Sequence, residues 1–191
     1  LVALHSYDEL KIMLVVDEHE EDKWSFAKYM PHFWDADKEN RFFAKTVDDV
    51  RELSTFLEKD VLSRRERSTS KQGNYFPHYV MIVTSTALRK KCTALEQILE
   101  EDSDLGFSVL MLGNSISDFP KETEMVIGAN GDDSVIFRKD ETTGKQIHFK
   151  ADRANKDVFE NVSVQIANIE LDLEDQKFVL PNMLTFLEMF N

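Results

Sequence analysis

The chain has 191 residues, of which 42% are hydrophobic and 31% are charged, a composition typical of a globular domain that can bury a substantial core. Its 36 acidic and 23 basic residues give a formal net charge of −13, which argues against general nucleic-acid binding, because phosphates are met by an excess of lysine and arginine. The single cysteine, Cys92, excludes an intrachain disulfide and fits a reducing compartment.

Neither end of the chain shows a targeting signal. No apolar run approaches a length of about 18 residues, which is needed to cross a bilayer, and Leu1–Leu4 lacks the basic start of a signal peptide. The sequence begins without methionine and ends inside an apolar pattern at Phe190-Asn191. We therefore expect the chain to be part of a longer protein, in which Leu1–Leu4 forms the last turn of a helix.

The first elements alternate between apolar runs and a helical pattern. Lys11–Val16 is almost continuously apolar and ends at Asp17, which is typical of a central parallel strand that is covered on both faces. A short helix is expected over Glu20–Tyr29, and Pro31 ends it. Arg41–Lys45 is expected to form a second strand.

A long helix is expected from Thr46 onward. Asp49 lies three residues after Thr46, which nearly matches a capping box with aspartate in place of glutamate. Arg64 and Arg65 lie near the C-terminal end of this helix, where the helix dipole favours cations. Polar residues over Ser68–Asn74 indicate an exposed loop. Apolar residues recur at helical spacing on the face expected to be buried: Val47, Val50, Leu53, Leu57 and Val61.

The middle of the chain repeats the order of strand and helix. Tyr79–Val83 is typical of a buried strand and is followed by Thr84-Ser85. A single helix is expected over about Thr86–Glu101. Gly106–Leu112 is expected to form the next strand, which ends at Gly113-Asn114-Ser115.

The last part of the chain favours antiparallel strands and one more helix. Met125–Ile127 and Val135–Phe137 read as short strands parted by a turn over Gly128–Asp133, and Lys139–Lys145 closes a hairpin with Ile147–Phe149. A helix is then expected over about Asp152–Glu170, and the apolar tail Phe178–Phe190 needs a partner surface. The residues expected on the buried face of this helix are Phe159, Val162, Ile166 and Ile169.

Strands that alternate with helices predict right-handed βαβ units in a three-layer α/β fold with a mostly parallel sheet. The late hairpin predicts an antiparallel addition at one edge. This layout resembles that of a nucleotide-dependent motor, yet two chemical parts of such a motor are missing from the sequence. There is no G-x-x-x-x-G-K-[S/T] phosphate loop, and the strand Tyr79–Val83 ends in Thr84 where a P-loop motor has a carboxylate that holds Mg²⁺.

The run Asp17–Asp22 contains residue types that ligate metals and follows a strand end, where α/β folds bind ligands. A solvated acidic loop that stabilises the next helix is the favoured interpretation.

His32 and His78 have no recognisable serine or cysteine partner, so a structural role is favoured over a catalytic one. Cys92 lies inside an expected helix beside Lys91. Lysines nearby would lower the pKa of its thiol, but an inert thiol is favoured.

Two further features have a functional and a structural interpretation. Arg64 and Arg65 could reach the nucleotide of a neighbouring subunit as arginine fingers. A solvated helix end is the favoured interpretation. Gly128–Gly131 contains glycines but opens no helical pattern, so a turn is favoured over a phosphate-binding loop.

Taken in chain order, these motifs resemble one family. Asp8–Asp17 and Tyr29–Phe33 are similar to the strand–acid and Pro-His segments of FtsK/SpoIIIE-type motor ATPases, in which they follow the phosphate-loop helix. His78–Thr84 matches the Walker B strand, with threonine where the family has aspartate. Gly106–Leu112 resembles the strand that senses the state of the nucleotide.

A narrower resemblance covers essentially the whole chain. Leu4–Leu10, Trp24–Trp34 and Leu180–Phe190 are similar to segments of the membrane-anchored coupling ATPase of type VII secretion systems in Gram-positive bacteria. They resemble its domain between the transmembrane helices and the first standard ATPase domain. The second and third segments are fairly specific, whereas the strand patterns alone are not.

The resemblance implies a P-loop or RecA-like ATPase fold. It implies a degenerate ATPase-like domain over residues 1–177, whose first strand and phosphate-loop helix lie before Leu1. Residues 178–191 would then lead toward the next ATPase domain. The positions that the resemblance assigns to the former nucleotide site are Thr84 (Walker B), Asn114 (end of the sensor strand) and Asp17 (strand end).

We therefore expect the domain to function by binding other proteins or domains instead of by hydrolysing ATP. The domain would lie at the cytoplasmic face of the bacterial cell membrane and couple the membrane anchor to downstream ATPase domains during export of small helical substrates. No catalytic residue, metal site or cofactor is expected in the chain itself, whereas the longer protein would use ATP and Mg²⁺. The expected partners are the other domains of that ATPase, the membrane secretion complex and the exported substrates, without nucleic acid.

Two alternatives remain open at this point. The chain could be a working nucleotide-binding or hydrolysing domain that upstream residues or a neighbouring subunit complete. Asp17 or the run Asp17–Asp22 would then supply the carboxylate that holds the metal. The chain could also be an α/β interaction module without motor ancestry.

Overall fold

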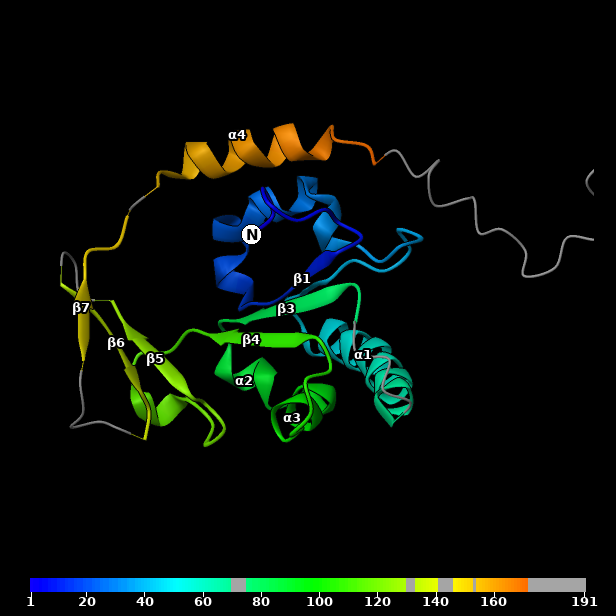
Figure 1. The fold of residues 1–191 in the computed structure, drawn as a ribbon. Helices are drawn as coiled ribbons and strands as arrows, with labels where there is room; N and C mark the ends of the chain where they lie inside the picture. Colours follow the sequence, from blue (N-terminus) through cyan, green and yellow to red (C-terminus); the bar gives the residue numbers. More distant parts are fainter. Residues whose placement is uncertain (70–74, 130–132, 141–145, 153, 172–191) are drawn as a thin grey trace, which may run out of the picture.

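The structure is a computed structural model that describes residues 1–69, 75–129, 133–140, 146–152 and 154–171. A parallel four-stranded sheet has the order β2-β1-β3-β4, and a separate antiparallel three-stranded sheet has the order β5-β6-β7 (Figure 1). The strands are β1 Leu10–Val15, β2 Phe43–Ala44, β3 His78–Val83, β4 Phe107–Met111, β5 Met125–Gly128, β6 Ser134–Arg138 and β7 Ile147–Phe149.

Helices cover both faces of the parallel sheet, which confirms the predicted three-layer α/β architecture. Helices α1, α2 and α3 lie on one side, and the N-terminal 3₁₀ turns and α4 lie on the other (Figure 1). The helices are η1 Glu18–Tyr29, η2 Pro31–Phe33, α1 Val47–Thr69, α2 Thr86–Arg89, α3 Thr93–Leu99, η3 Ile116–Asp118 and α4 Lys156–Ala167, where η marks a 3₁₀ helix.

The parallel strands are aligned so that their carboxyl ends meet at one edge of the sheet. Val15 of β1 pairs with Val83 of β3, and Val83 pairs with Met111 of β4. Every residue of β1 is buried, as expected for a central strand covered on both faces. The segments that follow β1, β3 and β4 therefore leave the sheet side by side.

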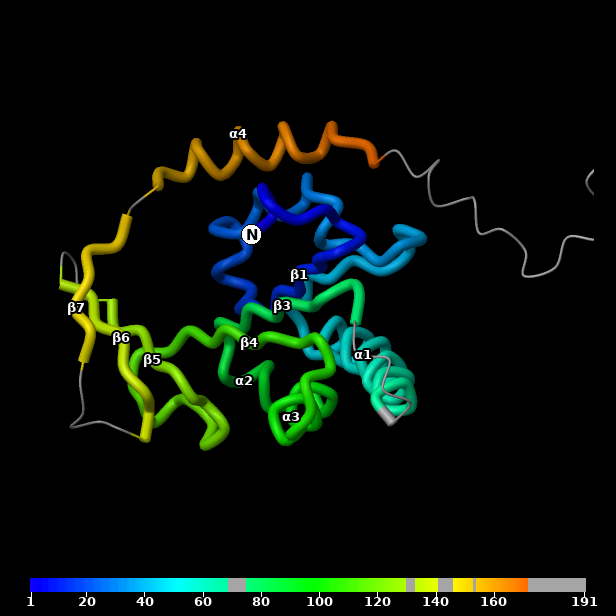
Figure 2. Tube along the Cα trace, viewed as in Figure 1, coloured from blue at the N-terminus to red at the C-terminus, as the bar shows by residue number. Residues whose placement is uncertain are grey.

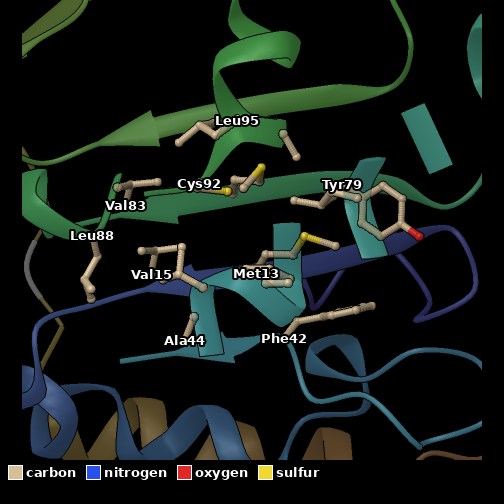
Figure 3. Packing of buried hydrophobic residues seen from close by; sticks show 14 residues of the cluster. Met13, Val15, Phe42, Ala44, Tyr79, Val83, Leu88, Cys92 and Leu95 are labelled. Carbon is tan, nitrogen blue, oxygen red and sulfur yellow. The ribbon is translucent and has the colours of Figure 1, made fainter. Parts of the chain in front are cut away.

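The larger hydrophobic core lies between the sheet and the helices α1 and α3 (Figure 3). Phe42 and Tyr79 meet edge to face at 6.1 Å between ring centroids, and Tyr79 stacks on Phe107 at 5.4 Å. Burial raises the pKa of Tyr79 to about 12, so its phenol is neutral at physiological pH. The core residues labelled in Figure 3 are Met13, Val15, Phe42, Ala44, Tyr79, Val83, Leu88, Cys92 and Leu95.

The smaller core lies on the opposite face of the sheet. It is formed by Ile12, Leu14, Val16, Ala27, Met30 and Phe33. Helix α4 crosses over the N-terminal turns after the chain leaves β7 (Figure 2). It is held there in part by Phe159, which stacks on Phe26 with ring centroids 5.5 Å apart.

The long helix begins as the sequence predicts. The Thr46 hydroxyl accepts a hydrogen bond from the Asp49 amide at 3.2 Å, and the Asp49 carboxylate accepts one from the Thr46 amide at 2.9 Å. This reciprocal pair is the capping box. The predicted inner face is buried at Val50, Leu53, Leu57 and Val61, whereas Val47 is exposed at the helix start.

Three predicted elements differ in detail. The helix expected over Glu20–Tyr29 is a 3₁₀ helix that begins at Glu18, and the second strand contains only Phe43–Ala44. The single helix expected over Thr86–Glu101 is wrong, because the chain forms two short helices. Ser85 caps the first by accepting the Leu88 amide at 3.3 Å, and Cys92, in an extended conformation, precedes the second. The break allows Cys92 to point into the core.

The late strands form their own sheet, so the predicted addition at an edge of the parallel sheet is wrong. In this small sheet Ile127 pairs with Ile136, which pairs with Ile147. The predicted turns over Gly128–Asp133 and Lys139–Lys145 lie partly outside the described residues.

Helix α4 is shorter than predicted and packs through a narrower face. Ile166 is buried and Val162 is half-buried, but Phe159 and Ile169 are exposed, contrary to the prediction. The predicted apolar tail Phe178–Phe190 lies outside the described residues. Among the described helices, none has the length and apolar character that a membrane-spanning segment requires.

Candidate functional site

The carboxyl edge of the parallel sheet brings together residues from two neighbouring strands. The Thr84 amide donates to the Val15 carbonyl at 2.9 Å, which extends the pairing of β1 and β3 by one residue. The buried Ser85 hydroxyl then donates to Oδ1 of Asp17 at 2.6 Å. The carboxylate that the sequence places after β1 thus lies directly beside the end of β3.

Thr84 occupies the strand-end position without supplying a carboxylate. Its hydroxyl oxygen is buried, and no group among the described residues forms a well-aligned hydrogen bond with it. The hydroxyl is nevertheless close to the Glu20 carboxylate, and this contact, with a smaller contribution from Lys23, lowers the pKa of Glu20. The end of β3 is therefore followed by two hydroxyl groups, and the nearby acids are Asp17, just before η1, and Glu20 within η1.

Two acids of the run Asp17–Asp22 are paired with lysines. Glu20 pairs with Lys23 at 2.9 Å, and Glu21 pairs with Lys45 at 2.6 Å. The hydrogen bond with Glu21 raises the pKa of Lys45. Glu18, Glu20 and Glu21 all lie in the first turn of η1, where acidic side chains are favoured. No three His, Cys, Asp or Glu side chains gather as a metal site would require within the described part of the chain.

Asn114 lies beyond the end of β4 on an exposed turn. Its amide and that of Ser115 donate to Oδ2 of Asp118 at 3.1 and 2.9 Å. The bond from the Ser115 backbone belongs to the capping box of η3, and the bond from the Asn114 backbone lies next to it. Among the described residues, the Asn114 side chain forms no hydrogen bond with Asp17, Thr84 or Ser85, so the structure joins two of the three predicted positions and leaves the third apart.

The two histidines named from the sequence have structural surroundings. His32 is buried, and its Nε2 lies 2.9 Å from the His5 carbonyl. Burial lowers the pKa of His32 against the opposing effect of the His5 carbonyl. The Nε2 of His78 lies 3.0 Å from the Ser108 hydroxyl, and burial lowers the pKa of His78 as well.

Cys92 is a buried thiol in the main core. Burial raises its pKa, so the thiol form dominates at neutral pH and the lysines nearby do not activate it. This agrees with the favoured sequence interpretation of an inert cysteine. Its position between α2 and α3, instead of within one helix, explains why the thiol reaches the core.

Arg64 overturns the favoured prediction of a solvated helix end, because only 1% of its side chain is exposed. Its guanidinium donates to the carbonyls of Leu105 at 2.8 Å and Pro77 at 2.7 Å. It also forms a 2.6 Å ion pair with Asp60, although the angle is poor for a hydrogen bond. Its carbon centre lies 4.7 Å from the ring centroid of Tyr79.

These contacts connect the end of α1 with the starts of β3 and β4. Gly106 makes the approach possible, because it has φ of 78° and an added Cβ would lie 2.7 Å from Nη1 of Arg64. Arg65 is bonded to Glu101 at 2.6 Å. Both guanidinium groups are thus engaged within the domain, and neither extends outward as an arginine finger would. The sequence signal that could have revealed Arg64 is its spacing of three residues from Val61, which places both on the inner face of α1.

Two hollows on the surface lie away from the strand ends. One, of about 220 Å³, lies between the segment Glu39–Phe43 and the first turns of α1. The other, of about 250 Å³, lies between α3 and Pro120. The glycine-bearing turn named from the sequence begins at Gly128, at the end of β5 opposite Val135, and its remainder is only partly described.

The sequence is similar to two secretion proteins along its whole length. It is 25% identical to the type VII secretion system protein EssC of Staphylococcus aureus (strain NCTC 8325 / PS 47) over 198 residues, which cover 100% of this chain. It is 23% identical to the ESX secretion system protein EccC of Geobacillus thermodenitrificans (strain NG80-2), over 99% of this chain. The chain spans 13% of the length of each of these curated relatives. No protein-family model matches it.

The fold is similar to that of solved ATPase domains. EssC (ATPases 2 and 3) of Geobacillus thermodenitrificans matches with a TM-score of 0.61 at 11% identity, over 86% of this chain and 38% of the other. EccC (ATPases 2 and 3) of Thermomonospora curvata, solved in complex with a signal sequence peptide, matches with a TM-score of 0.55 at 13% identity, over 87% of this chain and 38% of the other. These matches show that the chain shares the fold of these ATPase domains.

Proposed function

Because the chain is homologous to the EssC and EccC proteins of type VII secretion systems, we propose that it is a catalytically degenerate ATPase-like domain of such a secretion motor. It functions by contacting other domains, and it couples the membrane anchor to downstream ATPase domains while small helical substrates are exported. Its location is the cytoplasmic face of the bacterial cell membrane. Its partners are the neighbouring domains, the membrane complex and the exported substrates.

The observation that supports degeneracy most strongly is the end of β3. A P-loop motor needs a carboxylate there to hold Mg²⁺ and orient the attacking water. Thr84-Ser85 follow this strand, and the Ser85 hydroxyl donates a hydrogen bond to one oxygen of the neighbouring Asp17 carboxylate. A hydroxyl group cannot act as a base at neutral pH and is a weaker ligand for Mg²⁺ than a carboxylate. The carboxyl edge of the parallel sheet is therefore suited to holding β1 beside β3, and it is poorly suited to ATP hydrolysis.

Hydrolysis of ATP by the full-length protein tests the degeneracy. We expect Thr84→Ala and Asp17→Asn to leave the Mg²⁺-dependent hydrolysis rate within about twofold of the parent rate, because other domains carry the chemistry. A loss of about 100-fold or more in either variant, the size expected for removing a catalytic group, would show that this domain hydrolyses ATP.

Export tests the coupling role separately. A full-length protein that lacks residues 1–171 should still hydrolyse ATP through its remaining domains but should fail to export its substrates. Export at the parent level after this deletion would contradict a coupling role. In this account residues 1–177 form the domain and residues 178–191 lead toward the next ATPase domain, with ATP and Mg²⁺ bound elsewhere in the longer protein.

One observation favours the alternative of a working nucleotide site. The Asp17 carboxylate lies beside the end of β3, which is where a metal-binding carboxylate would be needed. The buried Thr84 hydroxyl nearby forms no well-aligned hydrogen bond with the described residues. Upstream residues or a neighbouring subunit would then have to supply the phosphate-binding loop. Mg²⁺-dependent nucleotide binding that Asp17→Asn abolishes and Ser85→Ala preserves would support this alternative.

A further inference from the structure

The small antiparallel sheet is apolar on both of its faces. Residues that pair across strands share a face, and the faces alternate along each strand. On one face Val126 is buried and its partner Phe137 is partly buried. Antiparallel sheets with one solvated face normally carry polar side chains there. The apolar side chains on the other face of this sheet, here called the isoleucine face, are Met125, Ile127, Ile136, Ile147 and Phe149.

The isoleucine face is exposed to solvent in the single chain. Ile127 and Ile147, on the two outer strands, are 62% and 63% exposed, and Met125 is 51% exposed. Ile136 lies on the middle strand between the two outer isoleucines and is partly buried. The exposed parts of these side chains form a continuous apolar patch on the order of 400 Å², a size at which surface patches on soluble proteins often bind a partner.

The small sheet carries few charges although the chain is strongly acidic. The strands β5, β6 and β7 contain no aspartate or glutamate, whereas the whole chain has 36. Within these strands the only charged side chain on the isoleucine face is that of Arg138, which forms a 3.4 Å ion pair with Asp140. His148 lies on the opposite face, 2.8 Å from Asp133. The isoleucine face therefore has no excess charge that would select a partner of opposite charge.

We propose that two copies of this chain pair through the isoleucine face, with their small sheets packed face to face. A two-fold interface uses the same patch on both copies, so the patch must match itself. The row Ile127–Ile136–Ile147 does so, because a two-fold axis over Ile136 in the plane of the interface sets isoleucine against isoleucine along the whole row. Two copies of net charge −13 repel each other, and this repulsion is smallest where carboxylates are absent.

The size of the isoleucine face sets the strength of this contact. Two patches and their rims would bury roughly 1,000 Å² in total, which is at the lower end of the range for specific interfaces. We therefore expect a weak dimer with a dissociation constant on the order of 100 μM. A weak contact of this kind becomes effective when two copies are held in one assembly, because their effective concentration rises. This inference goes beyond the proposed function and does not depend on it.

Sedimentation equilibrium of the 191-residue protein tests the proposal. Between about 10 μM and about 1 mM the average mass should rise from one chain toward two and no further, because a two-fold contact closes on itself. Raising the salt from about 50 mM to about 500 mM should lower the dissociation constant by about threefold or more, because salt screens the repulsion between the acidic copies. A mass of one chain at the highest concentration, or a mass that grows beyond two chains, would overturn the proposal.

Lysine variants locate the contact. Ile127→Lys and Ile147→Lys should each raise the dissociation constant by about tenfold or more, because an ammonium group would be buried in an apolar interface. Their urea midpoints should stay nearly unchanged, because both side chains are exposed in the single chain. Each substitution makes the net charge less negative, so a weaker dimer would not result from added repulsion between the copies.

Leu62→Lys is the matched control. Leu62 is an exposed leucine on α1, far from the small sheet in sequence, and it is 57% exposed. This variant should keep the dissociation constant within about twofold of the parent value. A dimer that survives both isoleucine substitutions would show that the contact lies elsewhere. An equal loss of pairing in Leu62→Lys would show that the isoleucine face is not specific, and either result would overturn the proposal.

Chemical cross-linking tests the two-fold arrangement independently. Packed sheets lie about 10 Å apart, so a bis-maleimide linker of about that length should join two copies of Ile136→Cys. The parent protein should not cross-link, because its single cysteine, Cys92, is buried. Leu62→Cys should not cross-link either. If Ile136→Cys failed to cross-link at concentrations where it sediments as a dimer, the proposed arrangement would be wrong.

Discussion

Arg64 is a buried cation with a well-defined set of partners. Arg64 has two carbonyl partners, one carboxylate and an aromatic ring around it, and these come from α1, the start of β3 and the entry to β4. A planar guanidinium can satisfy all of them at once, whereas a lysine ammonium is a compact point charge. Arg64 therefore stabilises the packing of the long helix against two strands.

Substitutions of Arg64 and of the neighbouring, more exposed Arg65 should separate the effect of the buried contacts on stability from that of a surface charge. We expect Arg64→Lys to lower the free energy of unfolding by about 3 kcal/mol, because it leaves buried carbonyls and the Asp60 carboxylate without a full partner. Arg65→Lys should cost less than about 1 kcal/mol, since Arg65 is 42% exposed and its ion pair with Glu101 is screened by solvent. Urea unfolding monitored by circular dichroism measures both. Equal losses would mean that the buried contacts contribute little.

The buried His32 makes stability depend on pH. Its pKa is lowered from 6.5 in the folded protein, mainly by burial, so the unfolded chain binds a proton more readily. Stability from this group is therefore complete above about pH 6.5 and is lost as the pH falls below it. The loss is at most about 1.4 kcal/mol per pH unit.

Unfolding at pH 7.5 and 5.5 tests this sign. The parent protein should lose more stability over this interval than His32→Gln does. His19→Gln, at an exposed histidine on η1, is the control and should lose as much as the parent. A steeper loss in His32→Gln than in the parent would show that the sign is wrong.

At the scale of elements, sequence reasoning was most reliable where a regular pattern decides the structure. The apolar runs predicted β1, β3 and β4, and the Thr46–Asp49 pair predicted the start of α1, because local hydrogen bonds and hydrophobic spacing are sufficient there. The break between α2 and α3 was missed, because it depends on burying Cys92 in a core that no local pattern reveals. The separate small sheet was missed for the same reason, since strand partners are set by tertiary packing.

The candidate site was only partly predictable. Asp17 and Thr84 could be identified as strand ends, but their proximity, and the Ser85 hydroxyl that joins the two strands, follow from the register of β1 and β3. Arg64 was predicted to be solvated because charge and position near a helix end favour that interpretation. Its burial depends on Gly106, far away in sequence, which leaves space for the guanidinium.

The capping box gives a test at this scale. Asp49→Ala should lower the free energy of unfolding by about 1 kcal/mol, because the amides of Lys45 and Thr46 lose their acceptor. Burial acts to raise the pKa of Asp49, but these hydrogen bonds lower it below 3.8, so the contribution is present above about pH 4 and is lost as the pH falls through the lowered pKa. Asp48→Ala, one residue away and exposed, is the control and should cost less than about 0.5 kcal/mol. Thermal or urea unfolding at neutral pH would contradict the account if both variants behaved alike.

At the scale of the whole molecule, the chain has the fold of ATPase domains, and the two residues after β3 are Thr84 and Ser85 instead of a carboxylate. The three layers and the parallel sheet match ATPase domains of secretion proteins. The strand that should end in a carboxylate ends in two hydroxyl groups, one of which is bonded to Asp17. Within the described residues, β4 forms one border of the same sheet. Together these features support the proposal that the domain works through contacts with its neighbours.

Calorimetry with ATP and ADP, with and without Mg²⁺, tests whether the domain binds nucleotide. It should be performed on the protein with its N-terminal neighbouring sequence included, so that a missing phosphate loop cannot explain a negative result. The account predicts no heat of binding at millimolar nucleotide. Binding at micromolar nucleotide that requires Mg²⁺ and disappears in Asp17→Asn would contradict it and would assign a working nucleotide site to the end of β3.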